Sequence, residues 1–191
     1  MEKRYLTYLA VIALFLCISS ATYAAPILNS YNGHYYEAIS AEIDWLEAEN
    51  IAESSTYQGV AGHLATLTSI EEHNWVWENL GYPFRYYLGA SDREVEGVWK
   101  WVTGESWVFT NWKTVEPNNG NGWYQEDALA FYYEGKWNDL PDTHNIIVDN
   151  PNYRYIYGYV VEYDTVVPEP ATLLLFPLGL LSAYFLKKNK K

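Results

Sequence analysis

Oxygen-bearing side chains gather in one short stretch of this chain, residues 116–139. The stretch opens with Glu-Pro-Asn-Asn-Gly-Asn-Gly, closes with Lys-Trp-Asn-Asp, and contains neither cysteine nor histidine. Carboxylate and amide oxygens are the ligands that a hard cation such as Ca²⁺ prefers. The sequence therefore predicts a calcium site on loops around two apolar runs. The oxygen donors of the stretch are Glu116, Asn118, Asn119, Glu126, Asp127, Asn138 and Asp139.

Enzymatic chemistry fits the same residues less well. Glu116 and Glu126 could serve as the paired carboxyl groups of a glycosidase. They lie, however, among amides and acids suited to chelation, and the chain shows no Ser-His-Asp arrangement and no Gly-rich phosphate motif. We therefore expect a binding protein that is not an enzyme.

A zinc site is not expected from the sequence. The four histidines, His34, His63, His73 and His144, are not expected to cluster, and the single cysteine, Cys17, lies near the N-terminus. Zinc sites are usually built from closely spaced cysteines and histidines. His63 is predicted to be a packed histidine beside a strand.

The charge distribution argues against nucleic-acid binding. The formal net charge is −12, from 12 basic and 24 acidic residues. Six of the basic residues but only two of the acidic ones lie in the two ends, so the middle of the chain carries −16. Such a surface repels phosphates and attracts cations.

The elements that must position the candidate ligands are helices early and strands late. A first helix is predicted over about 45–53, opened by a capping box of Asp44 and Glu47,. Ser69 and Glu72 repeat the box before a second helix, whose apolar face is predicted to be Ile70, Trp75, Val76 and Leu80,. Strands are predicted over 86–90, 98–102, 129–132, 136–137 and 156–163, after an early strand near Tyr35,. This order favours an α+β domain.

Both ends of the chain have features of processing signals. Residues 1–24 resemble a secretory signal peptide, with Lys3 and Arg4, an apolar run over 6–18 and small residues before Ala25,. The alternative is a first transmembrane helix, for which the run is short. Cys17 lies inside the run, so the mature chain has no cysteine and can form no disulfide,.

The C-terminal segment, residues 166–191, combines Val-Pro-Glu-Pro, an apolar run over 171–186 and a Lys-Lys-Asn-Lys-Lys end. Sixteen helical residues span about 24 Å, short of a hydrocarbon core of about 30 Å. Together these features resemble the PEP-CTERM sorting signal of Gram-negative bacteria. The resemblance implies a transient inner-membrane anchor, removal by an exosortase, and delivery to the cell surface or extracellular matrix. The alternative is a permanent C-terminal anchor.

Four separated motifs carry a family resemblance over about 32–164, within a predicted domain 25–165. They are Gly-His-Leu-Ala-Thr-Leu at 62–67, Tyr-Leu-Gly-Ala at 87–90, Glu-Pro-Asn at 116–118 and Trp-Asn-Asp at 137–139. In order and spacing the chain resembles a C-type lectin-like domain. The resemblance implies that fold, with two helices, antiparallel sheets and a long calcium-binding loop region. It also implies a cis bond before Pro117.

The resemblance further implies how a sugar would be held. In the family's principal calcium site the Glu-Pro-Asn side chains, a later Glu and the Asn-Asp pair hold one ion, which implies five ligands here: Glu116, Asn118, Glu126, Asn138 and Asp139. In the family, Glu-Pro-Asn accompanies mannose-, glucose- or fucose-type hydroxyl pairs. Each hydroxyl would donate to a carboxylate and accept from an amide, which requires a mixed shell. Asp92, Glu96 and Asp127 resemble the acids of an auxiliary calcium site; the alternative is a solvated acidic loop.

Two features depart from the family pattern. The usual disulfides are impossible, since Ala128 follows Glu126 and Asp127 where a cysteine is typical, so aromatic packing must replace them. The loop before Glu126 carries its own insert with Trp123, which could stack on a sugar or belong to the core. We therefore expect an exported, calcium-dependent lectin for mannose- or glucose-type sugars of exopolysaccharide or cell surfaces. The alternative is an adhesion module that binds protein on the same fold.

Overall fold

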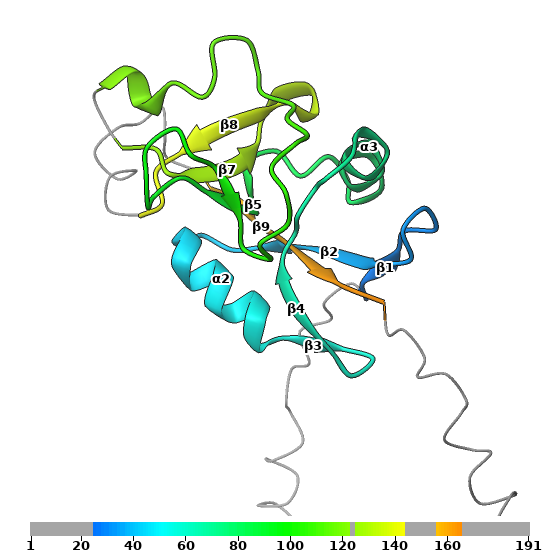
Figure 1. Ribbon diagram of the computed structural model, residues 1–191. Coiled ribbons are helices and arrows are strands. Elements are labelled where there is room, and N and C mark those ends of the chain that lie inside the picture. The colour runs from blue at the N-terminus through cyan, green and yellow to red at the C-terminus, as the bar shows by residue number, and fades with distance from the viewer. Residues whose placement is uncertain (1–24, 123–124, 144–155, 166–191) are drawn as a thin grey trace, which may run out of the picture.

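The computed structural model describes residues 25–122, 125–143 and 156–165 (Figure 1). The predicted signal peptide, the predicted sorting signal and Trp123 lie outside the described residues. The strands are β1 (Ile27–Leu28), β2 (Tyr35–Ser40), β3 (Thr56–Tyr57), β4 (Val60–Leu64), β5 (Tyr86–Ser91), β6 (Lys100–Trp101), β7 (Ala128–Phe131), β8 (Trp137–Leu140) and β9 (Gly158–Tyr163). The helices are α2 (Trp45–Ser54) and α3 (Ile70–Asn79), with short 3-10 turns η1 (Asn119–Gly122) and η2 (Tyr133–Gly135).

The last strand, β9, lies in the middle of the sheet. The strand order is β1-β2-β9-β5-β7-β8, and β4 pairs with β9 as well. β9 runs antiparallel to β2 and β4 and parallel to β5. Strands from the two ends of the domain therefore pair with each other, and the fold is complete only when β9 is in place.

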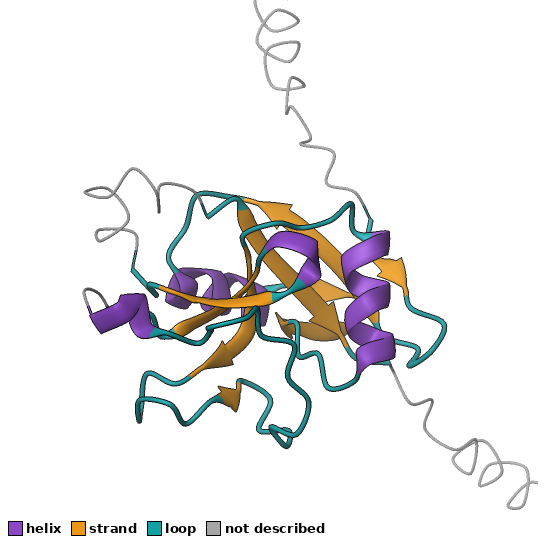
Figure 2. Cartoon of the chain, turned by 90° about the horizontal axis from the view of Figure 1, so that it is seen from above, coloured by secondary structure: helices purple, strands orange, loops and turns teal. Residues whose placement is uncertain are grey.

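The sheet is covered on both faces, because side chains of a strand alternate between its two sides. Tyr87 belongs to a core cluster with Trp45, Ala48 and Ala52 of α2, whereas its neighbour Leu88 belongs to a second cluster with Val76 of α3. Figure 1 shows α2 and α3 on opposite sides of the central strands. Figure 2, which views the chain from above, shows helices on either side of the sheet. The predicted α+β class is confirmed.

Helix α2 begins at the predicted residue, but a different hydrogen bond satisfies its first backbone N–H. The Asp44 side chain makes no capping hydrogen bond. Instead the backbone N–H of Trp45 donates to the carbonyl of Asp142, 3.0 Å away. A tertiary contact thus satisfies a donor that an isolated helix would leave to its cap. The expected capping box is therefore absent at this helix.

Helix α3 keeps half of its predicted capping box. Ser69 Oγ accepts from the Glu72 backbone N–H at 3.2 Å, but the Glu72 carboxylate does not return to the backbone N–H of Ser69. It contacts the Tyr36 hydroxyl at 2.6 Å and accepts from the Thr68 N–H at 2.7 Å. The carboxylate is buried, so it pairs with a donor from the core.

The predicted apolar face of α3 is wrong at its start. Ile70 is 43% exposed, while Glu72 and His73 are buried. His73 Nδ1 accepts from the Trp137 indole N–H at 3.1 Å, and this hydrogen bond makes burial of an imidazole possible,. A hydrophobic pattern cannot reveal such paired polar groups.

The observed strand boundaries differ from the predicted ones in two places that matter for the site. Of the predicted strand 98–102 only Lys100–Trp101 is a strand, and Val98 is 48% exposed. The predicted short strand at 136–137 extends to Leu140 as β8. Asn138 and Asp139 therefore lie on a strand, and the expectation that they lie on a loop is wrong.

In the part of the chain that the structure describes, no helix is long and apolar enough to cross a membrane.

Candidate functional site

A cluster of tryptophans holds the loop that leads to Glu116. Trp137 is fully buried and packs edge-on against Trp101, Trp112 and Phe109, with ring centroids 5.3–5.9 Å apart. Trp99 and Trp107 extend the cluster. Aromatic pairs of this kind contribute about 0.5–1.5 kcal/mol each beyond burial of area. The cluster thus holds the loop by aromatic packing without any disulfide among the described residues.

Backbone hydrogen bonds join this loop to β8. The Trp137 N–H donates to the Asn111 carbonyl at 2.9 Å, and the Lys113 N–H donates to the Trp137 carbonyl at 2.9 Å. The Glu116 N–H then donates to the Lys113 carbonyl at 3.0 Å, which closes a turn. The segment carrying Glu-Pro-Asn is thereby placed beside the strand that carries Asn138 and Asp139.

Asp139 is the centre of the predicted principal site. Its Oδ2 accepts from the backbone N–H groups of Asn118 and Asn119, at 2.9 and 2.6 Å. Asn118 Nδ2 donates to Glu116 Oε2, and the Glu116–Pro117 bond is cis, as the resemblance predicts. Glu116, Asn118 and Asp139, which are separated by up to 23 residues, are brought together.

Glu126 and Asn138 complete the set from either side. Glu126 is 1% exposed, and its Oε2 accepts from the Gly120 N–H at 2.6 Å. Asn138 is buried beside Asp139, and its Nδ2 donates to the Asp139 carbonyl at 2.7 Å. Asp139 and Glu126 thus accept from the backbone of the turn η1, whereas the side chain of Asn138 contacts the backbone of Asp139.

The electrostatics of the set favour a cation. Asp139 Oδ1 is buried and has no hydrogen-bond donor within the described residues. Burial, and then the neighbouring Asp139 carboxyl, raises the pKa of Glu116 to about 7. Burial also raises the pKa of Asp139. Two opposed carboxyl groups and a buried oxygen without a donor are costly unless a cation or a proton lies between them, so the residues fit Ca²⁺.

The predicted auxiliary acids lie next to this set. Asp92 Oδ2 accepts from the Gly97 N–H at 2.8 Å, and the Asp92 N–H contacts the Asp127 carbonyl at 3.3 Å. Asp92 Oδ1 is buried without a donor among the described atoms. Burial, and then Asp92, Asp127 and Asp139, raise the pKa of the Glu96 carboxyl. These four acids therefore share one electrostatic field.

Asn119 belongs to the oxygen-rich stretch, but its bridging role between the two acidic sets was not predicted from the sequence. Its Nδ2 donates to Glu96 Oε2 at 2.6 Å, and its Oδ1 accepts from the Glu126 N–H at 2.8 Å. Its backbone φ is 48°, in the left-handed region that asparagine tolerates better than most residues,. Asn119 thus connects the auxiliary acids to the principal set. The Asn-Asn-Gly-Asn-Gly run is the signal that could have indicated a left-handed turn here.

Comparisons with known proteins agree with this geometry. The sequence model of the family described as "Lectin C-type domain" matches residues 47–146. The chain is 32% identical over 157 residues to halomucin of Haloquadratum walsbyi, covering 75% of this chain but 2% of halomucin. It is 30% identical over 124 residues to the alpha-N-acetylgalactosamine-specific lectin of Patiria pectinifera, covering 60% of this chain and 71% of that lectin.

A solved structure has the same fold. The carbohydrate-recognition domain of cow CD23, solved in the presence of a GlcNAc2Man3 oligosaccharide, superimposes with a TM-score of 0.59 at 18% identity. The comparison covers 74% of this chain and 99% of that domain. A family match over more than half of the chain, together with this fold, shows that the chain belongs to the C-type lectin domain family.

Proposed function

We propose that this protein binds carbohydrate through Ca²⁺ held by Glu116, Asn118, Glu126, Asn138 and Asp139, without cleaving it. Bound there, the ion would offer coordination positions to two neighbouring sugar hydroxyls. Glu116 and Glu126 would accept the hydroxyl protons, and the amides of Asn118 and Asn138 would donate to the hydroxyl oxygens. The three further acids Asp92, Glu96 and Asp127 are proposed as a second calcium site.

The single observation that carries the proposal is the arrangement around Asp139. One oxygen of its carboxylate is fixed by two backbone N–H groups, while the other is buried without a donor among the described residues. The Glu116 carboxyl, with its raised pKa, faces the same place. A folded protein rarely tolerates such a group unless a ligand satisfies it.

The proposed sugar class is mannose- and glucose-type, on the Glu-Pro-Asn motif at 116–118. The relative named for alpha-N-acetylgalactosamine is a reason to include that sugar as a competitor. A shallow single site should bind a monosaccharide at millimolar order, about −4 kcal/mol, so firm adhesion requires many copies on one surface.

The proposed setting is the outside of a Gram-negative cell. Residues 1–24 would direct export, 25–165 would form the lectin domain, and 166–191 would anchor the chain in the inner membrane until an exosortase removes that tail. Mass spectrometry of the secreted form tests this: a chain that ends at Lys191 excludes sorting cleavage, whereas a new C-terminus near the Pro-Glu-Pro segment supports it.

A mannan column tests the binding function. The wild type should be retained in calcium buffer and released by a chelator. Glu116→Gln should pass through unretained, while the control Glu78→Gln, which removes the same charge from an exposed position on α3, should be retained. Retention that is insensitive to the chelator would exclude the calcium-lectin function, and no retention of the wild type in calcium buffer would favour the protein-binding alternative.

A further inference from the structure

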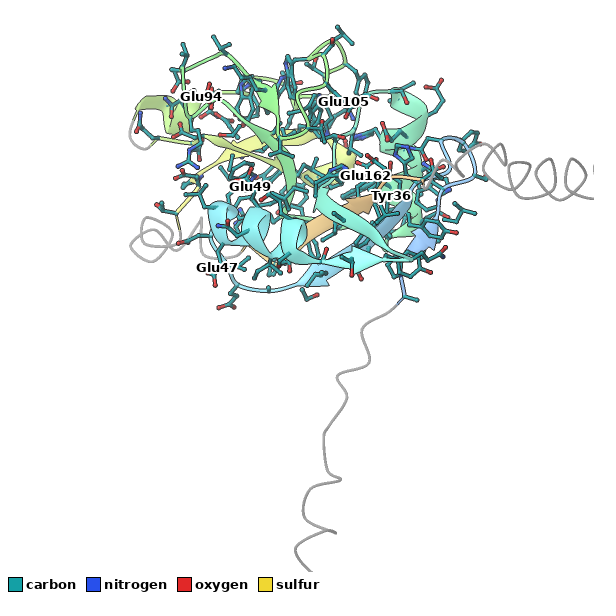
Figure 3. All side chains as sticks on the ribbon, turned by 60° about the horizontal axis from the view of Figure 1, so that its bottom comes forward. Tyr36, Glu47, Glu49, Glu94, Glu105 and Glu162 are labelled. Carbon is teal, nitrogen blue, oxygen red and sulfur yellow. The ribbon has the colours of Figure 1, made fainter. Side chains whose placement is uncertain are left out.

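A second group of metal-ligating side chains lies on one face of the sheet. Cross-strand partners include Tyr36 with Glu162 on β2 and β9, and His63 with Glu162 on β4 and β9. Opposed residues of an antiparallel pair share a face, as do residues two apart on one strand. His34, His63, Glu162 and Asp164 therefore fall on the same side. Figure 3 shows Glu162 beside Tyr36, well away from Glu94 in the acidic loop of the calcium region.

The distances within this group are short. His34 Nδ1 lies 2.6 Å from Glu162 Oε1 and 3.5 Å from Asp164 Oδ1, and His63 Nε2 lies 3.3 Å from Asp164 Oδ1. Among the described residues, the ligand atoms of His34, Glu162 and Asp164 form a group within 4.8 Å of one another. His63 is not a member of that group and reaches it through Asp164 alone. The expectation that the histidines do not cluster is thus wrong for two of the four, because the strand pairing joins residues that are 29 positions apart.

The orientation of His63 points to a ligand. Its Nδ1 lies 2.9 Å from the Leu64 carbonyl, which can only accept, so Nδ1 carries the ring hydrogen,. Nε2 then lies 3.3 Å from Asp164 Oδ1, where it donates to the carboxylate when the ring carries a second proton and offers its lone pair to a cation when it does not,. A histidine that donates one ring N–H to a backbone carbonyl and aims the other nitrogen at an acid has the arrangement of a metal ligand with its supporting shell.

The Glu162 carboxylate is held in place by similar supporting contacts. Glu162 is 1% exposed. Its Oε2 accepts from the Thr66 backbone N–H at 2.8 Å, and the Tyr36 hydroxyl lies 2.7 Å from its Oε1. The carboxylate is therefore fixed before any ligand arrives, with Oε1 facing His34. Such preorganisation is typical of carboxylates that bind a metal through one oxygen.

Two of the spacings suit a small tetrahedral ion. Bonds of about 2.0–2.1 Å from zinc to nitrogen or oxygen place neighbouring ligand atoms about 3.3–3.4 Å apart. The two contacts to Asp164, at 3.3 and 3.5 Å, already have this separation. The shorter contact between His34 and Glu162 is a hydrogen bond whose proton a metal would replace. A cavity of about 340 Å³, lined in part by His34 and Glu162, gives solvent a path to the group.

We propose that His34, Glu162 and Asp164 form a site for a divalent transition metal with the preferences of Zn²⁺, with His63 as a fourth ligand after a small shift of its side chain. Two imidazole nitrogens and two carboxylates suit zinc, whereas the calcium set contains oxygen ligands only. The site is separate from the proposed sugar site and does not depend on it. Because it joins the strand ends of β2, β4 and β9, bound metal would also hold the two ends of the domain together.

Titration of the metal-free full chain with Zn²⁺ in a calorimeter tests the proposal. We expect one Zn²⁺ per chain at this site, unaffected by saturating Ca²⁺. His63→Ala and Asp164→Asn should each weaken Zn²⁺ binding at least tenfold, since loss of even a supporting residue commonly costs about 10–100-fold. Asp164 is exposed, so its substitution leaves the fold intact and keeps the test valid if His63→Ala fails to fold.

Glu105→Gln is the matched control. Glu105 lies at the same cavity and accepts from Thr66 Oγ1 at 2.7 Å, but it is not a proposed ligand. Its variant should bind Zn²⁺ within twofold of the wild type. No uptake of Zn²⁺, or equal weakening by Glu105→Gln and Asp164→Asn, would overturn the proposal; the second result would mean that the acidic cavity attracts cations without a defined site.

Discussion

The carboxyl groups of Glu116 and Asp139 face each other across the turn that carries Asn118. Burial and the Asp139 carboxyl raise the pKa of Glu116 from an ordinary value of 4.5 to about 7. The metal-free protein therefore contains a conflict that either a proton or a cation can resolve. The balance between the two makes both stability and calcium binding depend on pH.

The first prediction concerns calcium affinity and pH. Ca²⁺ requires the ionised carboxylate, so protonation of Glu116 competes with the ion. Affinity should be constant above pH 8 and should fall by about tenfold per pH unit once the pH drops below about 7, as expected when one proton is displaced. Calcium titrations at pH 8, 7, 6 and 5 measure this. A constant affinity from pH 8 to pH 5 would show that Glu116 is not a ligand.

The second prediction concerns the stability of the metal-free protein. The folded-state pKa of Glu116 is raised, so its contribution to stability is fully present below pH 4.5 and is lost as the pH rises through about 7,. In chelator at pH 8, Glu116→Gln should therefore be at least as stable as the wild type, because the opposed negative charge is gone. Urea unfolding measures the difference, and a clear destabilisation would contradict the expected repulsion.

Asp139→Ala should have the opposite effect under the same conditions. It removes the acceptor for the Asn118 and Asn119 backbone N–H groups. Leaving such donors unsatisfied costs about 1–3 kcal/mol each, so we expect a loss of about 2 kcal/mol or more in the free energy of unfolding. Both variants should abolish calcium-dependent sugar retention, and the two mutations therefore separate the ligand role from the structural role of Asp139.

The third prediction concerns sugar class. The double variant Glu116→Gln with Asn118→Asp exchanges an acid and an amide across Pro117 while keeping the pair's net charge. Donor and acceptor positions are then reversed, and hydroxyl pairs of galactose type should compete better than those of mannose type. Retention of the wild type and the double variant on a mannose column and on a galactose column, each in calcium buffer, measures the order. An unchanged order would mean that the motif at 116–118 does not set specificity.

The site was predictable to the extent that its ligands occur in local motifs. Glu116 and Asn118 are two residues apart, and Asn138 and Asp139 are adjacent, so each pair is visible in the sequence. The bridging role of Asn119 was not visible in the sequence, because it depends on a left-handed turn that brings Glu96 and Glu126 to one side chain. Local motifs identify residue types, whereas the bridging contact is a property of the folded loop.

The fold was predictable from periodicity, but buried polar pairs were not. The order of helices and strands followed the hydrophobic pattern, and α2 begins at Trp45 as expected. His34 and His63 meet at Asp164 only because β9 lies between β2 and β4. Strand order in a sheet arises from long-range pairing, and a single sequence carries little information about it.

The fourth prediction explains the glycine of the Tyr-Leu-Gly-Ala motif. Gly89 lies on β5, and a Cβ at this position would meet the Leu64 carbonyl oxygen at 2.3 Å. The backbone there cannot retreat, since the Gly89 N–H donates to the Ala65 carbonyl at 2.8 Å. Gly89→Ala should therefore lower the free energy of unfolding by about 3 kcal/mol or more. Chemical unfolding measures the loss.

Gly59→Ala is the control for that experiment. Gly59 has a φ of +84° but no atom within 4 Å of its Cβ position, so alanine meets backbone strain without a clash. Strain of that kind costs about 1 kcal/mol. The two variants compare the same chemical change with and without a backbone contact. Equal losses of unfolding free energy in the two variants would show that β5 lies farther from Leu64 and Ala65 than the 2.3 Å contact implies. The motif would then have no steric requirement for glycine.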